Sequence, residues 1–364
     1  MEQLLVDKTL SEKLHNLVDR ILAKEAMITD IGLNGKMGAA IFLYHYASCY
    51  NNAACVQVAG NLLEDVRSNI AEITSIDVRS GLIGIDAGLK YLYKNGFIDT
   101  AMSEMPAVAD QRIYKALLDF PREHIHECFQ SLLELGKYFM QDDRKRSMTT
   151  TGPFSDFNRK CVLHFIDLLS LPDVKMIAQL NHKYILQVVD TLCQIHSTRS
   201  IVNDVQRFLP LGLQSLEYTL FNNVGFKPFA AGSNPFCIAV ALLQLYGKTY
   251  RLEFATLAVR LLEKYEEDVN TLYMTENIGN TELLLHAIAC NKLHSELRDK
   301  SFNNYARTCL ELYRERENSD NNTVQNSYQN DFSLQSGYAA EGMALLTLEG
   351  HIHPDWLEDL IGCY

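Results

Sequence analysis

Stretches in which nearly every residue is apolar alternate along this chain with amphipathic stretches. Residues 39–47 (AAIFLYHYA) and 236–246 (FCIAVALLQLY) are of the first kind. A helix that is apolar on all sides has to be enclosed by other elements. Both stretches are shorter than the roughly 20 residues that a membrane-spanning helix needs. We therefore expect both to form buried helices of a globular core.

The amphipathic stretches show helical spacing, with apolar residues at i, i+3, i+4 and i+7. One such set consists of Leu14, Leu17, Val18, Ile21 and Leu22. The same spacing recurs in Phe254, Leu257, Ala258, Leu261, Leu262 and Tyr265, and in Phe302, Tyr305, Ala306, Cys309, Leu310 and Tyr313. These segments are expected to be outer helices that place one face on the core.

Many of the buried stretches follow a glycine. In LNGKMGAAIFLYHYA, Gly35 and Gly38 are three residues apart, and in SGLIGIDAGLKYLY the same positions hold Gly81 and Gly84. Weaker copies begin near Gly152, Gly232, Gly279 and Gly337. Their uneven spacing is unlike a stacked solenoid and favours helix pairs joined by loops of varying length. The pattern predicts an all-α protein, an (α/α)6 toroid with six helical hairpins in an inner and an outer ring.

No linker rich in Pro, Gly or Ser divides the 364 residues, and a closed ring of hairpins needs the whole chain. We therefore expect a single domain over residues 1–364. Three segments are expected to depart from the pattern of hairpins: an insertion at Lys94–Leu118 before the next outer helix, a polar connection at Gln141–Thr151 and a loop at Glu315–Asp331.

The composition restricts the partners and the compartment. Lys and Arg total 33 against 45 Asp and Glu, a net charge of −12, which argues against nucleic acid or an anionic membrane as partner. The first residues lack the pattern of a signal peptide. The nine cysteines are scattered and odd in number, as in a protein with reduced thiols. The expectation is a cytoplasmic protein.

The repeated glycine-led helix start, followed by LYHYA or LKYLYKNGFID, resembles the lanthionine synthetase C (LanC) family of bacterial peptide cyclases over nearly the whole chain. The segment that begins DVRSGLIGIDAG at Asp77 is similar to a subgroup found beside peptide-maturation genes. In active members of that family, a zinc ion activates a cysteine thiol of a precursor peptide. The thiolate then adds to a dehydrated serine or threonine. The resemblance implies a role in peptide maturation, with a precursor peptide or a maturation enzyme as partner.

The resemblance also shows where zinc ligands would lie. Such a site uses thiolate and imidazole ligands. The corresponding positions before the later repeat glycines hold Ala231, Asn277, Gln335 and Ser336. None of these is a usual zinc ligand, so the resemblance implies no metal and no cofactor here. Only the acid before the second-repeat glycine is retained, as Asp77. We expect a protein without zinc-dependent cyclase activity that binds a peptide or partner, with Asp77 as its one candidate catalytic residue.

Two other classes of function stay open. Toroids of this type also serve glycoside-processing enzymes, which use a pair of carboxylates. Asp77 could form such a metal-independent acid/base pair with Glu276, Glu282 or Asp331. Acids at helix starts are also favoured by the helix dipole alone. A purely structural protein would instead have its cleft filled by side chains such as Phe229 and Tyr338.

Histidine and cysteine could also rebuild a metal site elsewhere. Cys161 and His164 have the i, i+3 spacing of one helix face, and His45 and His286 lie in expected inner helices. Their different offsets from the repeat glycines favour core or hydrogen-bonded histidines over a shared metal site.

Overall fold

In a computed structural model of the protein, every regular element of the described residues is a helix, so the all-α prediction is confirmed. The structure describes residues 8–125, 128–146, 153–169, 191, 213–214, 216–218, 220–221, 235–265, 279–319, 331–334, 336–357 and 360.

The chain divides into two compact units. The first comprises Met1–Pro106 and Tyr265–Gly362, and the second comprises Ala107–Lys264. Because the first unit combines both ends of the sequence, its core depends on contacts between residues that are far apart along the chain. The expected single domain over residues 1–364 stays a prediction.

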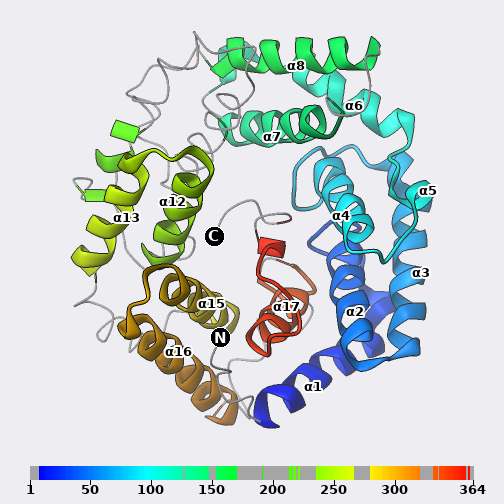
Figure 1. The fold of residues 1–364 in the computed structure, drawn as a ribbon. Coiled ribbons are helices and arrows are strands. Elements are labelled where there is room, and N and C mark those ends of the chain that lie inside the picture. The colour runs from blue at the N-terminus through cyan, green and yellow to red at the C-terminus, as the bar shows by residue number, and fades with distance from the viewer. Residues whose placement is uncertain are drawn as a thin grey trace. The chain divides into compact units, whose positions relative to one another are not determined.

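In the first unit, four largely buried helices follow one another side by side (Figure 1). They are, in spatial order, α15 (Asn280–Leu297), α17 (Tyr338–Leu348), α2 (Lys36–Tyr50) and α4 (Leu82–Lys94). Each of the first three packs against the next. Helix α17, near the end of the chain, therefore lies between α2, near its beginning, and α15.

A second helix packs against each of these four. The pairs are α16 (Lys300–Ser319) on α15, α1 (Lys8–Lys24) on α17, α3 (Ala53–Asn69) on α2, and the short α5 (Thr100–Ser103) on α4. Of these partners, α1 and α16 contain predicted amphipathic stripes, whereas α5 lies in the segment Lys94–Leu118, which was expected to be an insertion.

The helix pair α2–α3 shows how the sequence directs such a hairpin. Every residue from Met37 to Ala47 is buried. The helix ends at Asn51, whose φ of 52° is left-handed, and the Asn52 side chain accepts the N–H of Cys55 at 3.1 Å to cap α3. Asparagine is favoured both as a left-handed residue and as an N-cap. A turn of two asparagines thus joins a buried helix to an amphipathic one.

The predicted apolar stripes lie against the core. On α13 (Leu252–Tyr265), all six residues of the stripe are buried. On α1 and α16 the stripes are buried too, apart from the half-buried Leu22 and Tyr305. Helical spacing therefore identified the packed face of these helices correctly.

The second unit contains α6 (Ala107–Leu118), α7 (Phe129–Arg146), α8 (Pro153–Leu169), α12 (Pro235–Thr249) and α13. Helices α6, α7 and α8 pack against one another. On α12, the residues from Pro235 to Leu242 are all buried, as expected for an all-round apolar helix. Short 3-10 helices occur at Glu25–Met27, Ile70–Glu72 and Arg122–His124.

The bounds expected for the polar connection and for the loop were partly wrong. The insertion at Lys94–Leu118 contains α5 and α6, and α6 buries Ala109, Ile113 and Leu117 at a spacing of four. Helix α7 continues to Arg146 and α16 to Ser319, into segments expected to be polar connections. Arg, Lys and Glu are good helix formers, so a polar sequence at a helix end does not terminate it.

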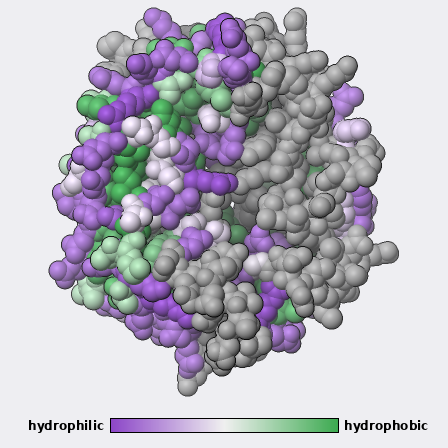
Figure 2. Space-filling view, turned by 180° about the vertical axis from the view of Figure 1, so that it is seen from behind, coloured by the Kyte–Doolittle hydropathy of each residue, from purple (hydrophilic) through white to green (hydrophobic). Residues whose placement is uncertain are grey.

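Purple, hydrophilic residues cover much of the described surface seen in Figure 2, and smaller green areas interrupt them. In the part of the chain that the structure describes, no helix has both the length and the apolarity that crossing a membrane requires.

Candidate functional site

The loops that precede α2, α4 and α17 use an aspartate in the same way. The three residues are Asp30, Asp77 and Asp331. In each, Oδ1 accepts the backbone N–H two residues ahead: Gly32 at 2.7 Å, Arg79 at 2.7 Å and Ser333 at 2.9 Å. This is the geometry of an Asx turn, in which a carboxylate replaces a backbone carbonyl in a tight turn. In each of these loops, a carboxylate of the loop itself therefore stabilises the turn.

The glycines of these loops are required by close packing of the backbone. A Cβ at Gly35 would lie 1.9 Å from the carbonyl oxygen of Asp30, and one at Gly84 would lie 1.8 Å from that of Val78. No side chain fits at either distance. The organising glycine motif of the sequence thus allows each loop to fold back over the start of its helix.

Hydrogen bonds connect the three loops, which we call the loop cluster (residues 30–35, 75–81, 331–334 and 336–337). The loop before α2 contacts both of the others. The bonds run from Asn34 N–H to the Arg79 carbonyl at 3.0 Å, from the Ser80 hydroxyl to the Asp30 carboxylate, and from Leu334 N–H to the Leu33 carbonyl at 3.0 Å. The cluster lies wholly in the first unit.

Asp77, the candidate catalytic residue, is held ionised within this cluster. Burial alone would raise the pKa of its carboxyl. The Ser75 hydroxyl and the backbone N–H groups of Ser80 and Arg79 donate hydrogen bonds that outweigh this effect, so the pKa is lowered. A carboxyl with a lowered pKa has no proton to give near neutral pH, which makes Asp77 a poor general acid.

Ser336, at a position that the resemblance assigns to a metal ligand, is exposed and belongs to the turn of Asp331. Its hydroxyl donates to Asp331 Oδ2 at 3.0 Å, and its N–H donates to the Ser333 hydroxyl at 3.2 Å. Its carbonyl accepts from the Thr281 hydroxyl at 2.9 Å. Ser336 therefore ties the first turn of α15 to the loop before α17.

The other candidate acids divide between described and undescribed residues. Glu282, in the first turn of α15, accepts the N–H of Gly279 at 3.1 Å, so it caps its own helix. Asp331 serves the turn described above. Ala231, Glu276, Asn277 and Gln335 lie outside the described residues. Phe229 does too, whereas Tyr338 is buried beside Phe332, with their ring centroids 5.8 Å apart.

His45 and His286 are core residues. His45 is buried and its Nε2 lies 2.8 Å from the hydroxyl of Tyr91, and burial lowers its pKa to about 4. Burial likewise lowers the pKa of His286 to about 3. Both are therefore neutral at pH 7. On α8, Cys161 is buried and its pKa is raised to about 11 by burial, while His164 is half-exposed.

Within the residues that the structure describes, no three side chains of His, Cys, Asp or Glu lie close enough together to hold a metal ion.

A buried carboxylate outside the loop cluster was missed by the sequence reasoning. The side chain of Glu349, just after α17, is only 2% exposed and accepts a hydrogen bond from the Tyr50 hydroxyl at 2.9 Å. Burial and this carboxylate raise the pKa of Tyr50 to about 12. His351 lies 3.4 Å from the same carboxylate. Nothing local signals this cluster, because Tyr50 and Glu349 come from opposite ends of the chain.

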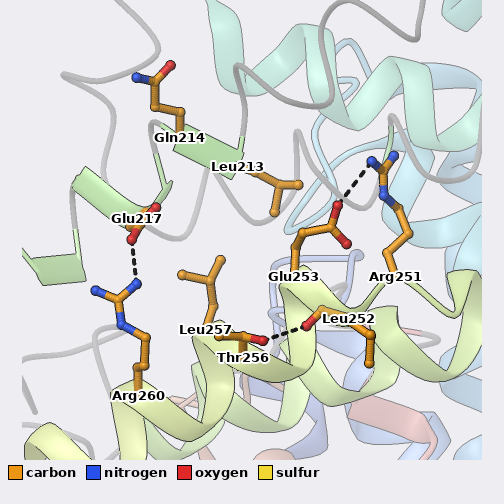
Figure 3. Close-up of a pocket in the computed structure, with 9 residues that line it drawn as sticks. All are labelled: Leu213, Gln214, Glu217, Arg251, Leu252, Glu253, Thr256, Leu257 and Arg260. Atoms are coloured by element: carbon orange, nitrogen blue, oxygen red, sulfur yellow. Dashed lines mark hydrogen bonds and ion pairs between the residues drawn. The ribbon is translucent and has the colours of Figure 1, made fainter.

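The second unit contains a pocket of about 550 Å³ over α13, also missed from the sequence. Leu213, Leu252 and Leu257 provide its apolar lining. Figure 3 shows two ion pairs on opposite sides of it: Arg260 with Glu217, and Arg251 with Glu253 at 3.3 Å. Residues 213–217 are some 40 positions from α13, so the sequence pattern does not bring them together.

No family model and no curated protein matches this sequence.

Proposed function

We propose that this protein is a LanC-like (α/α)6 toroid of peptide maturation, which binds a precursor peptide or a maturation enzyme without zinc-dependent cyclase chemistry. Two observations support the proposal: the sequence resemblance, and the hydrogen bonds that the polar side chains of the described loops make within their own turns.

The arrangement of the first unit supports the toroid. Helices α15, α17, α2 and α4 lie side by side, and each packs against a further helix. Because α17 contacts both α1 and α2, helices from the two ends of the chain meet. A ring of hairpins requires such a junction.

The hydrogen bonding of Ser336 is the observation that best supports the proposed absence of zinc chemistry. Where the family has a Cys-His pair, this chain has Gln335 and Ser336, and the Ser336 hydroxyl is engaged with Asp331. A serine hydroxyl is not a usual zinc ligand, and this one is part of a turn. The position is used to hold the loop in place.

The rival acid/base function receives less support. Asp77 and Asp331 each accept a backbone N–H of their own turn, and Glu282 caps its own helix. An acid/base pair needs one carboxyl that keeps its proton near neutral pH, and the lowered pKa of Asp77 excludes Asp77 from that one role. A local structural role accounts for all three described acids.

Selection of peptides on the intact protein tests the proposed binding function. A phage library of 12-residue random peptides is panned on the immobilised protein and in parallel on protein unfolded in urea. We expect families of related sequences to be enriched only on the folded protein, and the matching synthetic peptides to bind in solution. Failure to enrich any sequence over the unfolded control would overturn the proposed binding of a peptide.

A further inference from the structure

A phenylalanine covers a buried histidine near the C-terminal end of α4. The ring of Phe97 meets that of His45 edge to face, with the centroids 4.8 Å apart, and it stacks on the ring of Tyr44 at 5.5 Å. His45 is 6% exposed, and Tyr91, the other described ring in contact with it, is buried too. Phe97 is half-buried. Phe97 therefore separates the imidazole of His45 from solvent.

The backbone turn after α4 places Phe97 over His45. Gly96 has a φ of 74° and its N–H donates to the Tyr93 carbonyl at 3.0 Å, while the N–H of Phe97 donates to the Leu92 carbonyl at 3.0 Å. These two bonds and the left-handed glycine form a Schellman motif, which turns the chain back toward its helix. Such a turn is a local structure at a helix end, and helix ends open at a lower free-energy cost than a packed interior.

The surroundings of His45 do not offer an acid to a protonated ring. Its Nε2 lies 2.8 Å from the hydroxyl of Tyr91, the titratable group that α4 provides. Among the described residues of α3, α4 and α17, the helices that pack on α2, no carboxylate interacts with the ring. Burial is the cause that lowers its pKa. The covered position therefore disfavours the imidazolium form of His45.

We propose that His45 makes the contact between α2 and the turn at residues 95–99 sensitive to pH, so that mild acid opens the Phe97 cover. At a pH above the ordinary histidine pKa of about 6.5, the imidazole is neutral whether covered or exposed, and the cover stays closed. Below that pH, the exposed ring of the open state takes up a proton that the covered ring resists. Proton uptake therefore favours the open state, in which Phe97 leaves the Tyr44 and His45 side chains.

Hydrogen exchange measured by mass spectrometry tests this device at the amides of Gly96 and Phe97, at pH 7.5 and pH 5.0. With a pKa of about 4 when covered and about 6.5 when exposed, His45 should make opening about 30-fold more favourable at the lower pH. His45→Gln retains a hydrogen-bonding group but cannot take up a proton, so it should remove this increase. The chemical exchange rate of these amides is the same in both proteins at each pH, so the comparison isolates the opening.

Two further variants make the test specific. His353→Gln removes an exposed histidine that pairs with Asp355 at 2.9 Å, and it should leave the acid response unchanged. Phe97→Ala admits water to His45 at every pH, so exchange at Gly96 should be fast at both pH values and the acid response small. This variant also keeps the test decisive if His45→Gln does not fold, which circular dichroism checks.

The outcomes are independent of the proposed peptide binding. An acid response at Gly96 that disappears in His45→Gln and in Phe97→Ala supports the device, whether or not a peptide binds. An equal response in the wild type and His45→Gln would overturn it. A response that Phe97→Ala retains in full, or one that extends equally over α15 and α17, would overturn it as well, because the opening would then not be local to the cover.

Discussion

Asp30, Asp77 and Asp331 show how an acid at a suggestive position can serve the fold. Each carboxylate accepts the backbone N–H two residues ahead. The acid retained from the sequence resemblance is one of these three. For Asp77, a role in the turn needs only an acceptor oxygen, whereas a role in proton transfer needs a carboxyl group that can gain and lose a proton.

Substitution of Asp77 separates the two roles. Asp77→Ala removes the acceptor for two backbone N–H groups and should lower the free energy of unfolding by about 1 to 2 kcal/mol. Asp77→Asn keeps an oxygen and should restore most of that loss. Urea unfolding measures both variants, with the exposed Glu64→Gln on α3 as control. Equal losses for Ala and Asn would contradict the turn role.

The pH dependence of the same variants follows from the lowered pKa of Asp77. A carboxyl with a lower pKa in the folded state stabilises the protein above its unfolded pKa of about 4. That contribution is lost as the pH falls through the folded pKa. The stability difference between the wild type and Asp77→Asn should therefore be largest at neutral pH and vanish in acid. A difference that grows toward low pH would contradict this sign.

At the scale of elements, local pattern predicted the helices well. The stripe of α13 and the all-round burial of α2 follow directly from apolar spacing. Helix ends were predicted less well, because the polar ends of α7 and α16 favour a helix as much as a loop.

The candidate site was harder to predict than its helices. The sequence placed Asp77 before a glycine-led helix, but the turn around it depends on backbone geometry that periodicity does not encode. Glu349 with Tyr50, and Glu217 with Arg260, pair residues from distant parts of the chain. Such pairs become visible only when the helices are packed.

Gly84 tests the interpretation of the glycine motif as a packing device. In Gly84→Ala the new methyl group would lie 1.8 Å from the Val78 carbonyl oxygen, so the loop or helix has to shift. We expect a loss of about 3 kcal/mol or more in the free energy of unfolding. In Gly60→Ala on α3, the nearest atom is 3.7 Å away, and this control should be neutral or up to about 1 kcal/mol more stable. Native stability of Gly84→Ala would contradict the interpretation.

At the scale of the whole molecule, the proposed ring predicts that the two units unfold together. The single tryptophan, Trp356, is fully buried in the first unit and donates to the Thr347 hydroxyl at 2.9 Å. Its fluorescence reports the first unit, whereas far-UV circular dichroism reports helices of both. In one cooperative domain the two urea transitions coincide. Two separate midpoints would show that the units are independent domains.

Zinc content tests the central claim most directly, because the proposal keeps the fold of a peptide cyclase without its metal. Protein purified without chelator is offered excess zinc, desalted and measured by elemental mass spectrometry. The account predicts a zinc content far below one ion per chain. About one zinc per chain, lost when Cys161, His164, Cys237 or His286 is replaced, would contradict it and restore a metal-dependent reaction as the leading function.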